Sequence, residues 1–480
     1  MSKQFYITTT LPYVNAEPHV GFAMELIRAD VIARWRKSVG DEVFFNTGTD
    51  EHGSKLWQAA QKEGKEVKQY VDEYAEKFKG LVKLLGISED INFVRTTDAK
   101  HEKTAQEFWR RCQANGFIYK KAYQIKYCVG CELEKTDSEL DDKGECPLHP
   151  GRAIELIDEE NYFFKFSAFQ QPLLDFYTKH PKFVLPDFRF NEIKAFVERG
   201  LEDFSISRLK SKMPWGVAVP DDSDQVMYVW FDALVNYIST LGWPDNQAQF
   251  EAFWVNGTPT QYCGKDNLRQ QSAMWQAMLM SVNLPNTHQV VINGFYTGEG
   301  GIKMSKSIGN VVNPYDVVAE YGVDALRYFV TRETSSFDDS PFTMERFKDT
   351  YNANLANGLG NLVSRIMKMA ETNLMKCPAL VPALPSVDFQ TALSEYDTNK
   401  AASVVWEIIT KLDKKIQDTQ PFKLVKTDQA VGVKIIEELV TDLYTISQML
   451  NPLMPETAKI IQQLIEENKA PAQPLFLRKD

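Results

Sequence analysis

Four cysteine and histidine side chains near residue 130 have the spacing of a metal site. Cys128 and Cys131 form one short pair, and Cys146 and His149 form a second pair after 14 intervening residues. Two such pairs suit tetrahedral Zn²⁺, and four protein ligands leave no open coordination position. The spacing therefore predicts one structural zinc ion, and the alternative is four unrelated residues.

Two further segments carry residue types that suit phosphate chemistry. His19 and Gly21 stand in "EPHVGF", where a helix pattern follows the first strand-like segment, and a helix N-terminus favours anions. Lys303 and Lys306 stand in "GGIKMSKSIGN", just after the apolar run "HQVVIN". Taken singly, the histidine reads as a helix cap and the lysines as a solvated turn. The chain has neither a Walker motif nor GxGxxG after a strand, so P-loop and NAD-type sites lose their main support. Together, in this order on an α/β frame, the two segments are far more specific than either alone.

The elements expected around these residues are those of a parallel α/β sheet. "FYITTTLPY" is strand-like, and the helix after it places one apolar face at Val20, Ala23, Ile27, Val31 and Trp35. "DEVFFNTGTDEHG" repeats the plan, with a buried strand that ends in a polar loop. Ligands of such sheets bind beyond the carboxyl ends of the strands.

The pattern changes along the 480 residues predict four segments. Two to four domains are expected for this length. We predict the first half of a Rossmann-like catalytic domain at 1–115, an insertion with the zinc knuckle at 116–225, the second half with the lysine loop at 226–345, and an all-α helical bundle at 346–480.

Charge and composition narrow the class of protein. The net charge of −11 argues against sequence-independent nucleic-acid binding, but it leaves specific RNA recognition open. Residues 346–480 hold 16 Lys+Arg and 16 Asp+Glu, so the whole excess of −11 falls on the first 345 residues. The sequence shows no signal peptide and no apolar run of membrane-spanning length, so we expect a cytoplasmic protein.

These segments together resemble the class I aminoacyl-tRNA synthetases, and among them the methionyl-tRNA synthetases. The resemblance covers essentially the whole chain and rests on the zinc knuckle and on "TTTLPYVNAEPHVG", "NTGTDEHG", "YVWFDALVNY", "GKDN" and "KMSKS". It implies that L-methionine and ATP, the latter with Mg²⁺, form methionyl-adenylate and pyrophosphate. The methionyl group would then pass to the 3′ end of tRNA(Met).

The resemblance also implies roles for individual residues. His19 and Lys306 would stabilise the transition state at the α-phosphate, with Lys303 supporting the phosphates. The ATP site would comprise His19, Gly21, Asp266, Gly294, Lys303 and Lys306. The methionine pocket would comprise Leu11, Tyr13, Asp50, Trp230, Ala233 and Tyr237, with Asp50 pairing the α-ammonium group. For Trp230 the alternative is a core position in a buried strand.

Three positions depart from the family pattern. Phe22 stands where the first motif usually has histidine or another polar residue, so it cannot donate a hydrogen bond to phosphate. Gln270 and Gln271 stand where familiar members have an aromatic residue and a histidine. The choice of methionine rests on the resemblance, together with an insertion too short for the large editing domain of the leucine, isoleucine and valine enzymes.

A helical C-terminal domain would read the anticodon by stacking and by hydrogen bonds to base edges. Asn361 and Arg365 lie four residues apart, hence on one helical face, and the family uses this pair for the anticodon. Phe422 takes the place of the family's stacking tryptophan. Lys411, Lys414 and Lys415 share a face that would meet phosphate or simply face solvent. The chain ends soon after the last helices, so we expect a monomer.

Two other readings remain at this point. A nucleotidylyltransferase with a related HxGH motif would share the phosphate site, but it would not need an anticodon-type helical domain. A non-catalytic, zinc-containing RNA-binding paralogue should have lost His19 or Lys306, and both are present.

Overall fold

A six-stranded, all-parallel sheet forms the centre of the N-terminal part of the chain. The computed structural model describes residues 3–128, 133–135, 140–141, 143–147, 151, 154–302, 304, 312–378, 380 and 385–480. In spatial order the strands of the main sheet are β3 (Asn92–Arg95), β2 (Glu42–Thr49), β1 (Gln4–Thr8), β12 (Thr258–Gly264), β13 (Gln289–Asn293) and β7 (Val184–Leu185).

The strand order reverses direction at β1, which pairs with β2 on one side and with β12 on the other. Thr8, the last residue of β1, lies opposite Asn46 of β2 and Gln261 of β12. The chain therefore leaves β1 and β12 towards opposite sides of the sheet. Beyond the carboxyl ends of such strands lies the usual binding crevice of an open α/β sheet. The prediction of a parallel α/β sheet in this part of the chain is confirmed.

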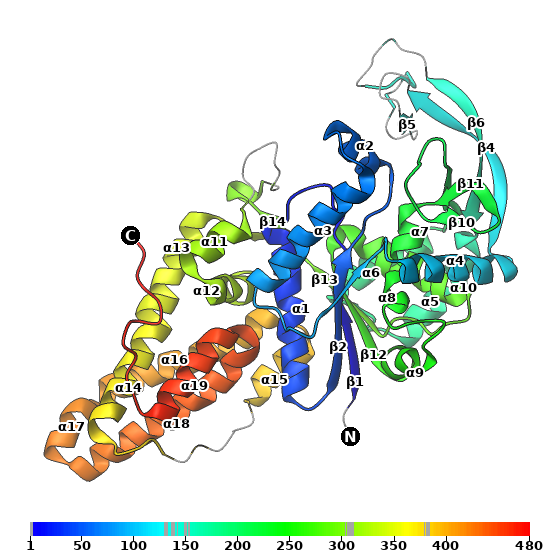
Figure 1. Cartoon of the computed structure of the whole chain (residues 1–480). Helices are drawn as coiled ribbons and strands as arrows, with labels where there is room; N and C mark the ends of the chain where they lie inside the picture. Colours follow the sequence, from blue (N-terminus) through cyan, green and yellow to red (C-terminus); the bar gives the residue numbers. More distant parts are fainter. Residues whose placement is uncertain are drawn as a thin grey trace.

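Helix α1 (Val20–Ser38) lies directly after β1 and is covered on both sides. Of its 19 residues 13 are buried, which is too many for a helix with one apolar stripe. One side faces the sheet, and the other packs against the C-terminal helices, as Figure 1 shows. The single apolar face expected from the sequence is therefore too narrow, because the second face is covered by residues about 400 positions further along the chain.

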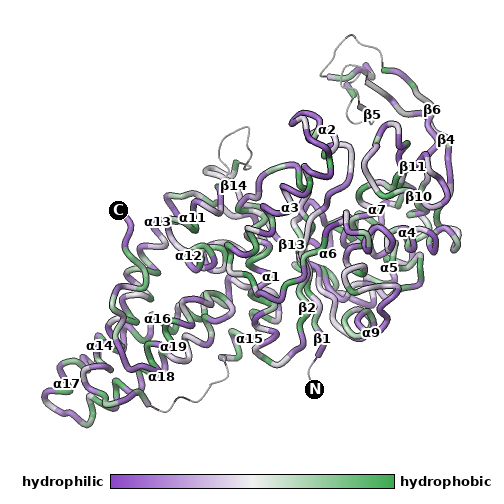
Figure 2. The backbone as a smooth tube through the Cα atoms, viewed as in Figure 1, coloured by the Kyte–Doolittle hydropathy of each residue, from purple (hydrophilic) through white to green (hydrophobic). Residues whose placement is uncertain are grey.

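Shorter helices flank the sheet. They are α2 (Ser54–Lys62), α3 (Val67–Leu84), α4 (Ala99–Ala114), α5 (Gln170–Lys179), α6 (Asp187–Glu198), α7 (Val229–Ala233), α8 (Asn236–Ser239), α9 (Gln247–Phe250), α10 (Trp275–Ser281), α11 (Pro314–Tyr321) and α12 (Val323–Tyr328). In Figure 2, purple and green stretches alternate along the helices, as expected where one face is buried and the other is wet.

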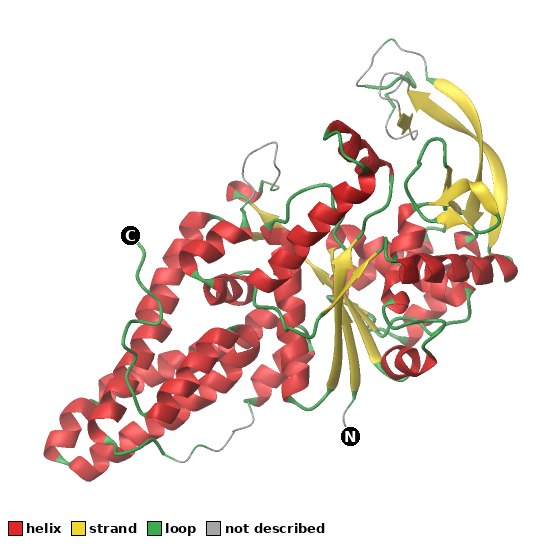
Figure 3. Cartoon of the chain, viewed as in Figure 1, coloured by secondary structure: helices red, strands yellow, loops and turns green. Residues whose placement is uncertain are grey.

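Antiparallel strands occupy much of the predicted insertion. A four-stranded sheet has the order β5 (Leu133–Lys135), β4 (Ile118–Cys128), β6 (Glu155–Phe164) and β8 (Phe204–Ser205). A three-stranded sheet consists of β10 (Ala218–Val219), β11 (Asp222–Met227) and β9 (Ser207–Leu209). Figure 3 shows the β4–β6 ribbon projecting from the body of the protein. In the chain, β7 lies between β6 and β8, but it pairs with β13 and forms an edge strand of the main sheet.

The last third of the described chain is helical. After the short parallel pair of β14 (Tyr296–Thr297) and β15 (Ser340–Pro341), the described residues contain no further strand. The helices are α13 (Met344–Thr350), α14 (Asn361–Asn373), α15 (Val387–Ser394), α16 (Thr398–Thr419), α17 (Pro421–Thr427), α18 (Gln429–Leu453) and α19 (Pro455–Glu467). None of the described helices is long and apolar enough to cross a membrane.

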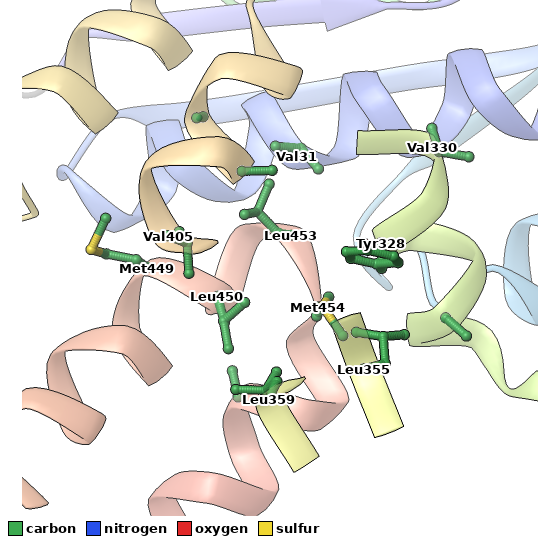
Figure 4. Close-up of a cluster of buried hydrophobic side chains, with 14 of the residues drawn as sticks. Val31, Tyr328, Val330, Leu355, Leu359, Val405, Met449, Leu450, Leu453 and Met454 are labelled. Carbon is green, nitrogen blue, oxygen red and sulfur yellow. The ribbon is translucent and has the colours of Figure 1, made fainter. Parts of the chain in front are cut away.

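One continuous hydrophobic core joins the sheet to these helices. In Figure 4, Val31 of α1 faces Leu453 of α18 across the contact between the two parts. A buried ion pair reinforces it: Asp30 of α1 accepts a 2.7 Å hydrogen bond from Arg327 of α12, which also donates to the Leu453 carbonyl. Both charged side chains are fully buried. Asp30 also pairs with Arg34 at 2.7 Å, so loss of Asp30 rather than loss of Arg327 would leave a buried charge without its carboxylate and destabilise the protein strongly.

Candidate active site

A cavity of about 540 Å³ opens beyond the carboxyl ends of β1, β2 and β12. Seven residues predicted for the site line it: Leu11, Tyr13, His19, Gly21, Asp50, Trp230 and Asp266. Two larger hollows, of about 1110 and 1160 Å³, lie elsewhere, and none of the described residues predicted for the site line them. The cavity at the switch point of the sheet is therefore the candidate active site.

His19 caps the N-terminus of α1 with its own side chain. Its backbone is extended (φ −131°, ψ 168°), and its Nδ1 accepts a 3.1 Å hydrogen bond from the Gly21 amide. Because Nδ1 accepts, the imidazole proton sits on Nε2. A Cβ on Gly21 would lie 2.9 Å from Cε1 of His19. Glycine at this position therefore lets the imidazole lie across the start of the helix.

Described residues on both sides of the predicted lysine loop lie near the cavity or the start of α1. At one end, Tyr296 lines the cavity. At the other end, the carbonyl of Val312 accepts a 3.3 Å hydrogen bond from the amide of Val20, the residue after His19. Lys303 and Lys306 themselves lie outside the described residues, whereas Met304 between them packs against the hydrophobic core. One described flank of this segment, at Val312, is thus bonded to the start of the helix that His19 caps.

Asp50 follows β2 directly and lies in the cavity wall. Backbone hydrogen bonds hold it against the segment after β1: its amide donates to Pro12 O at 2.9 Å, and its carbonyl accepts from Val14 N at 3.3 Å. Its Oδ1 is buried and has no hydrogen-bond partner among the described residues. Burial, and to a smaller extent the nearby Asp232 carboxylate, raise the pKa of Asp50 well above its usual range. A cationic ligand would satisfy both the charge and the unpaired oxygen.

The apolar and aromatic residues predicted for the methionine pocket fall into two sets. Leu11, Tyr13 and Trp230 line the cavity, and Trp230 is half-buried on the short helix α7 rather than in a core strand. Ala233 and Tyr237 are buried and do not line it.

The three departures from the family pattern have definite positions. Phe22 lines the cavity and packs edge-on against Phe78 of α3, with ring centroids 5.2 Å apart. Gln271 is buried and donates a 2.6 Å hydrogen bond to the hydroxyl of Tyr237. Gln270 leaves its buried Oε1 without a partner in the described part of the chain. A neutral amide therefore holds the Tyr237 hydroxyl.

On the nucleotide side, Asp266 follows β12 and lines the cavity. Gly294 follows β13 but does not line it; a Cβ there would lie 2.2 Å from the carbonyl carbon of Asp338, so close backbone packing requires glycine.

Glu25 of α1 is a cavity residue that no sequence motif singled out. Glu25 lines the cavity, and its Oε1 accepts a 2.6 Å hydrogen bond from the Thr10 amide. Burial raises the pKa of Glu25 to about 8. A carboxylate inside the apolar run "FAMELI" was the signal that could have pointed to it.

The predicted anticodon residues lie in the helical part. Asn361 is exposed at the start of α14, and Phe422 is 45% exposed on α17. Arg365, one turn after Asn361, forms an ion pair with Asp413 of α16. Among the three lysines on α16, Lys415 pairs with Glu438 of α18 at 3.0 Å.

Two of the four predicted zinc ligands, Cys128 and Cys146, belong to the described part of the chain. Cys131 and His149 lie outside the described residues. Cys128 ends β4 opposite Leu133 of β5. Cys146 is buried and follows a tight turn in which the Asp141 amide donates to Glu145 O at 2.9 Å. The structural zinc ion stays a prediction; among its four ligands, the side chain that the structure describes is the buried thiol of Cys146, a donor that suits zinc.

The all-parallel sheet, the cavity at its switch point and the histidine at a helix start define a nucleotide-binding α/β protein. The family model described as tRNA synthetases class I (M) matches residues 5–153 and 150–367. The Methionine--tRNA ligase of Thermotoga maritima is 39% identical over 98% of this chain and 76% of its own length. That of Brucella melitensis is 36% identical over 98% of this chain and 92% of its own.

A solved structure agrees with these relatives. The Mycobacterium tuberculosis methionyl-tRNA synthetase in complex with methionyl-adenylate is 32% identical, matches 100% of both chains and has a TM-score of 0.87. The chain therefore belongs to the class I aminoacyl-tRNA synthetases and, within them, to the methionyl-tRNA synthetase family.

Proposed function

We propose that this chain activates L-methionine with ATP, releases pyrophosphate and transfers the methionyl group from the adenylate to tRNA(Met). The observation that carries the proposal is Asp50: a buried carboxylate in the cavity wall with one unpaired oxygen. Such a group suits an α-ammonium, which is the feature that all amino acids share. The apolar and aromatic surfaces of Leu11, Tyr13 and Trp230 beside it suit a thioether side chain.

ATP would bind with its phosphates at the N-terminus of α1. There the positive end of the helix dipole and the Nε2–H of His19 face developing negative charge at the α-phosphate. The Gly-flanked loop with Lys303 and Lys306 would bring further cations to the phosphates and open again for product release. Donors that act more strongly on the transition state than on bound ATP raise the rate of adenylate formation. Mg²⁺ would accompany ATP.

The site has two halves at two strand ends. The methionine carboxylate attacks the α-phosphorus, so its oxygen forms the new P–O bond as the bond to pyrophosphate breaks. Asp50, after β2, would hold the amino group, and Asp266, after β12, would lie at the ribose. By the resemblance to the family, we place Ala233 of α7 and Tyr237 of α8 in the pocket and Gly294 beside ATP through its backbone.

The remaining parts of the proposal concern metal, RNA and assembly. A zinc ion held by Cys128, Cys131, Cys146 and His149 would fix the tip of the β4–β6 ribbon. Asn361, Arg365 and Phe422 would contact the anticodon. We propose that the enzyme works as a cytoplasmic monomer. Metal analysis after mild chelation should find about one zinc per chain, and a folded, metal-free protein would contradict the zinc site.

Aminoacylation tests the whole function. Purified protein, ATP–Mg²⁺ and labelled methionine should charge tRNA(Met), and omission of ATP should abolish charging. Transfer to tRNA lacking the methionine anticodon should be much slower. Methionine activation without any charging of tRNA(Met) would contradict the second half of the proposal.

A further inference from the structure

A buried triad of side chains lies behind the methionine side of the cavity. Nδ1 of His52 lies 2.6 Å from Oδ2 of Asp232, and Nε2 of His101 lies 2.8 Å from Oδ1 of the same carboxylate. Nδ1 of His101 lies 2.9 Å from the hydroxyl of Ser239. All three members of the triad are at most 2% exposed. Each imidazole thus donates one proton to one oxygen of Asp232.

The position of the triad in the chain connects two walls of the cavity. His52 follows Asp50 by two residues, in the loop after β2. Asp232 follows Trp230 by two residues, on α7. The hydrogen bond between His52 and Asp232 therefore ties the loop that carries the proposed ammonium partner to the helix that carries the aromatic wall. His101, from α4, holds the far side of Asp232.

The charges around the triad favour an ionised Asp232. Burial acts against the charge, but His52 and His101 outweigh it and lower the pKa of Asp232 to about 2. For His52, burial alone would lower the pKa. The carboxylates of Asp232, Asp50 and Glu102 outweigh this effect, so the pKa of His52 is raised. Glu102 of α4 lies 3.8 Å from Nε2 of His52. A charge-assisted hydrogen bond in a buried site is stronger and more directional than a neutral one.

The same loop is held on its other side by the aromatic ring of Trp215. The rings of His52 and Trp215 lie 5.6 Å apart, and the indole Nε1 donates to the Glu51 carbonyl at 2.6 Å. The Gly53 amide donates to the Trp215 carbonyl at 3.1 Å. These contacts hold the loop backbone from outside the cavity, whereas the His52–Asp232 bond joins it to α7.

We propose that His52 is a positioning residue for methionine: by gripping Asp232 it fixes Asp50 and Trp230 at the spacing that binds the amino acid. This inference rests on the proposed function. Since ATP binds on the other half of the cavity, loss of the grip should weaken methionine binding and leave ATP binding unchanged. A residue that only stabilises the fold would affect neither or both.

Two substitutions of one residue separate these roles. In His52→Asn the amide nitrogen is attached to Cγ, as Nδ1 is, so the bond to Asp232 can persist. In His52→Gln the donor lies one bond further out and the bond is lost. Methionine-dependent ATP–pyrophosphate exchange should give a methionine KM within threefold of the parent for Asn and at least about tenfold higher for Gln. The ATP KM should stay within twofold in both.

Three measurements keep the inference falsifiable. His101→Gln, which keeps a donor near Nε2, is the matched control and should leave the methionine KM within threefold of the parent. Asp232→Asn, isosteric with aspartate, tests the same bond if His52→Gln does not fold, and it should raise the methionine KM by a similar factor. In an Asp50→Asn background, His52→Gln should add less than threefold, because residues that act through one another are not additive.

Failure of the inference about His52 and failure of the proposed function give different results. An unchanged methionine KM in folded His52→Gln or Asp232→Asn would overturn the inference, as would a fully additive effect with Asp50→Asn or an equal rise in the ATP KM. If the parent protein itself shows no methionine-dependent exchange, the proposed function fails instead.

Discussion

Replacing Asp50 with asparagine should separate methionine binding from protein stability. The substitution keeps the shape of the side chain and removes its charge. In the complex, the α-ammonium would lose its buried anionic partner, a loss of about 3 kcal/mol, because a charged group would be left unsatisfied. At 1.36 kcal/mol per factor of ten, kcat/KM for methionine should fall by about 10²-fold.

In the unliganded protein, the same substitution should not lower the free energy of unfolding. Burial raises the pKa of Asp50 above its unfolded value. The stability that this carboxyl contributes is therefore fully present below its unfolded pKa and is lost as the pH rises through its folded pKa. Asparagine carries no such dependence, so Asp50→Asn should be at least as stable as the parent at neutral pH, and its advantage should grow as the pH rises.

Calorimetry provides the assay for the charge itself. Binding of the ammonium form of methionine should ionise Asp50 and release a proton, which appears as a dependence of binding enthalpy on buffer ionisation enthalpy. Asp50→Asn should abolish the proton release that comes from this group. A methionine KM unchanged by Asp50→Asn, or a large loss of thermal stability in the unliganded variant, would refute the reasoning.

Three other substitutions test separate parts of the site. Lys306→Ala should lower methionine-dependent ATP–pyrophosphate exchange by about 10²-fold or more, as for loss of a transition-state donor; an unchanged rate would remove this lysine from the mechanism. Glu25→Gln should flatten the pH dependence of the free energy of unfolding. The pKa of Glu25 is about 8 in the folded protein, against an ordinary value of 4.5. Between these two pKa values the parent should therefore lose up to about 1.4 kcal/mol of stability per pH unit relative to the variant. Urea unfolding at pH 6 and pH 8 would measure this, and a difference that does not vary with pH would contradict it. Arg365→Ala should slow charging of tRNA(Met) at least tenfold but leave pyrophosphate exchange intact, whereas Asp413→Asn, which removes the other half of the same partly exposed ion pair, should change stability by less than about 1 kcal/mol and preserve charging. Normal charging by Arg365→Ala would sink the anticodon assignment.

The local plan of the site could be predicted from sequence because its parts are adjacent in the chain. A strand, a break and a helix start place His19 at the start of α1, the helix after β1, and a second strand with a polar loop places Asp50 directly after β2. Both residues line the cavity. The period-two and helical patterns that predict these elements are local properties.

Contacts between segments far apart in the chain could not be predicted from these local patterns. Helix α1 has a second buried face because helices from the end of the chain cover it, and no local period records that contact. The triad beneath the cavity joins residues 131 and 180 positions apart. The carboxylate of Glu25 and its raised pKa also depend on burial by distant segments. Sequence motifs could identify the site, but not the supports that hold it.

The measurement that tests the central claim most directly is ATP–pyrophosphate exchange with each of the twenty amino acids. The account predicts that methionine supports exchange far better than any other amino acid and that His19→Ala strongly reduces it. Exchange supported equally well by another amino acid, or no exchange with methionine at all, would contradict the account.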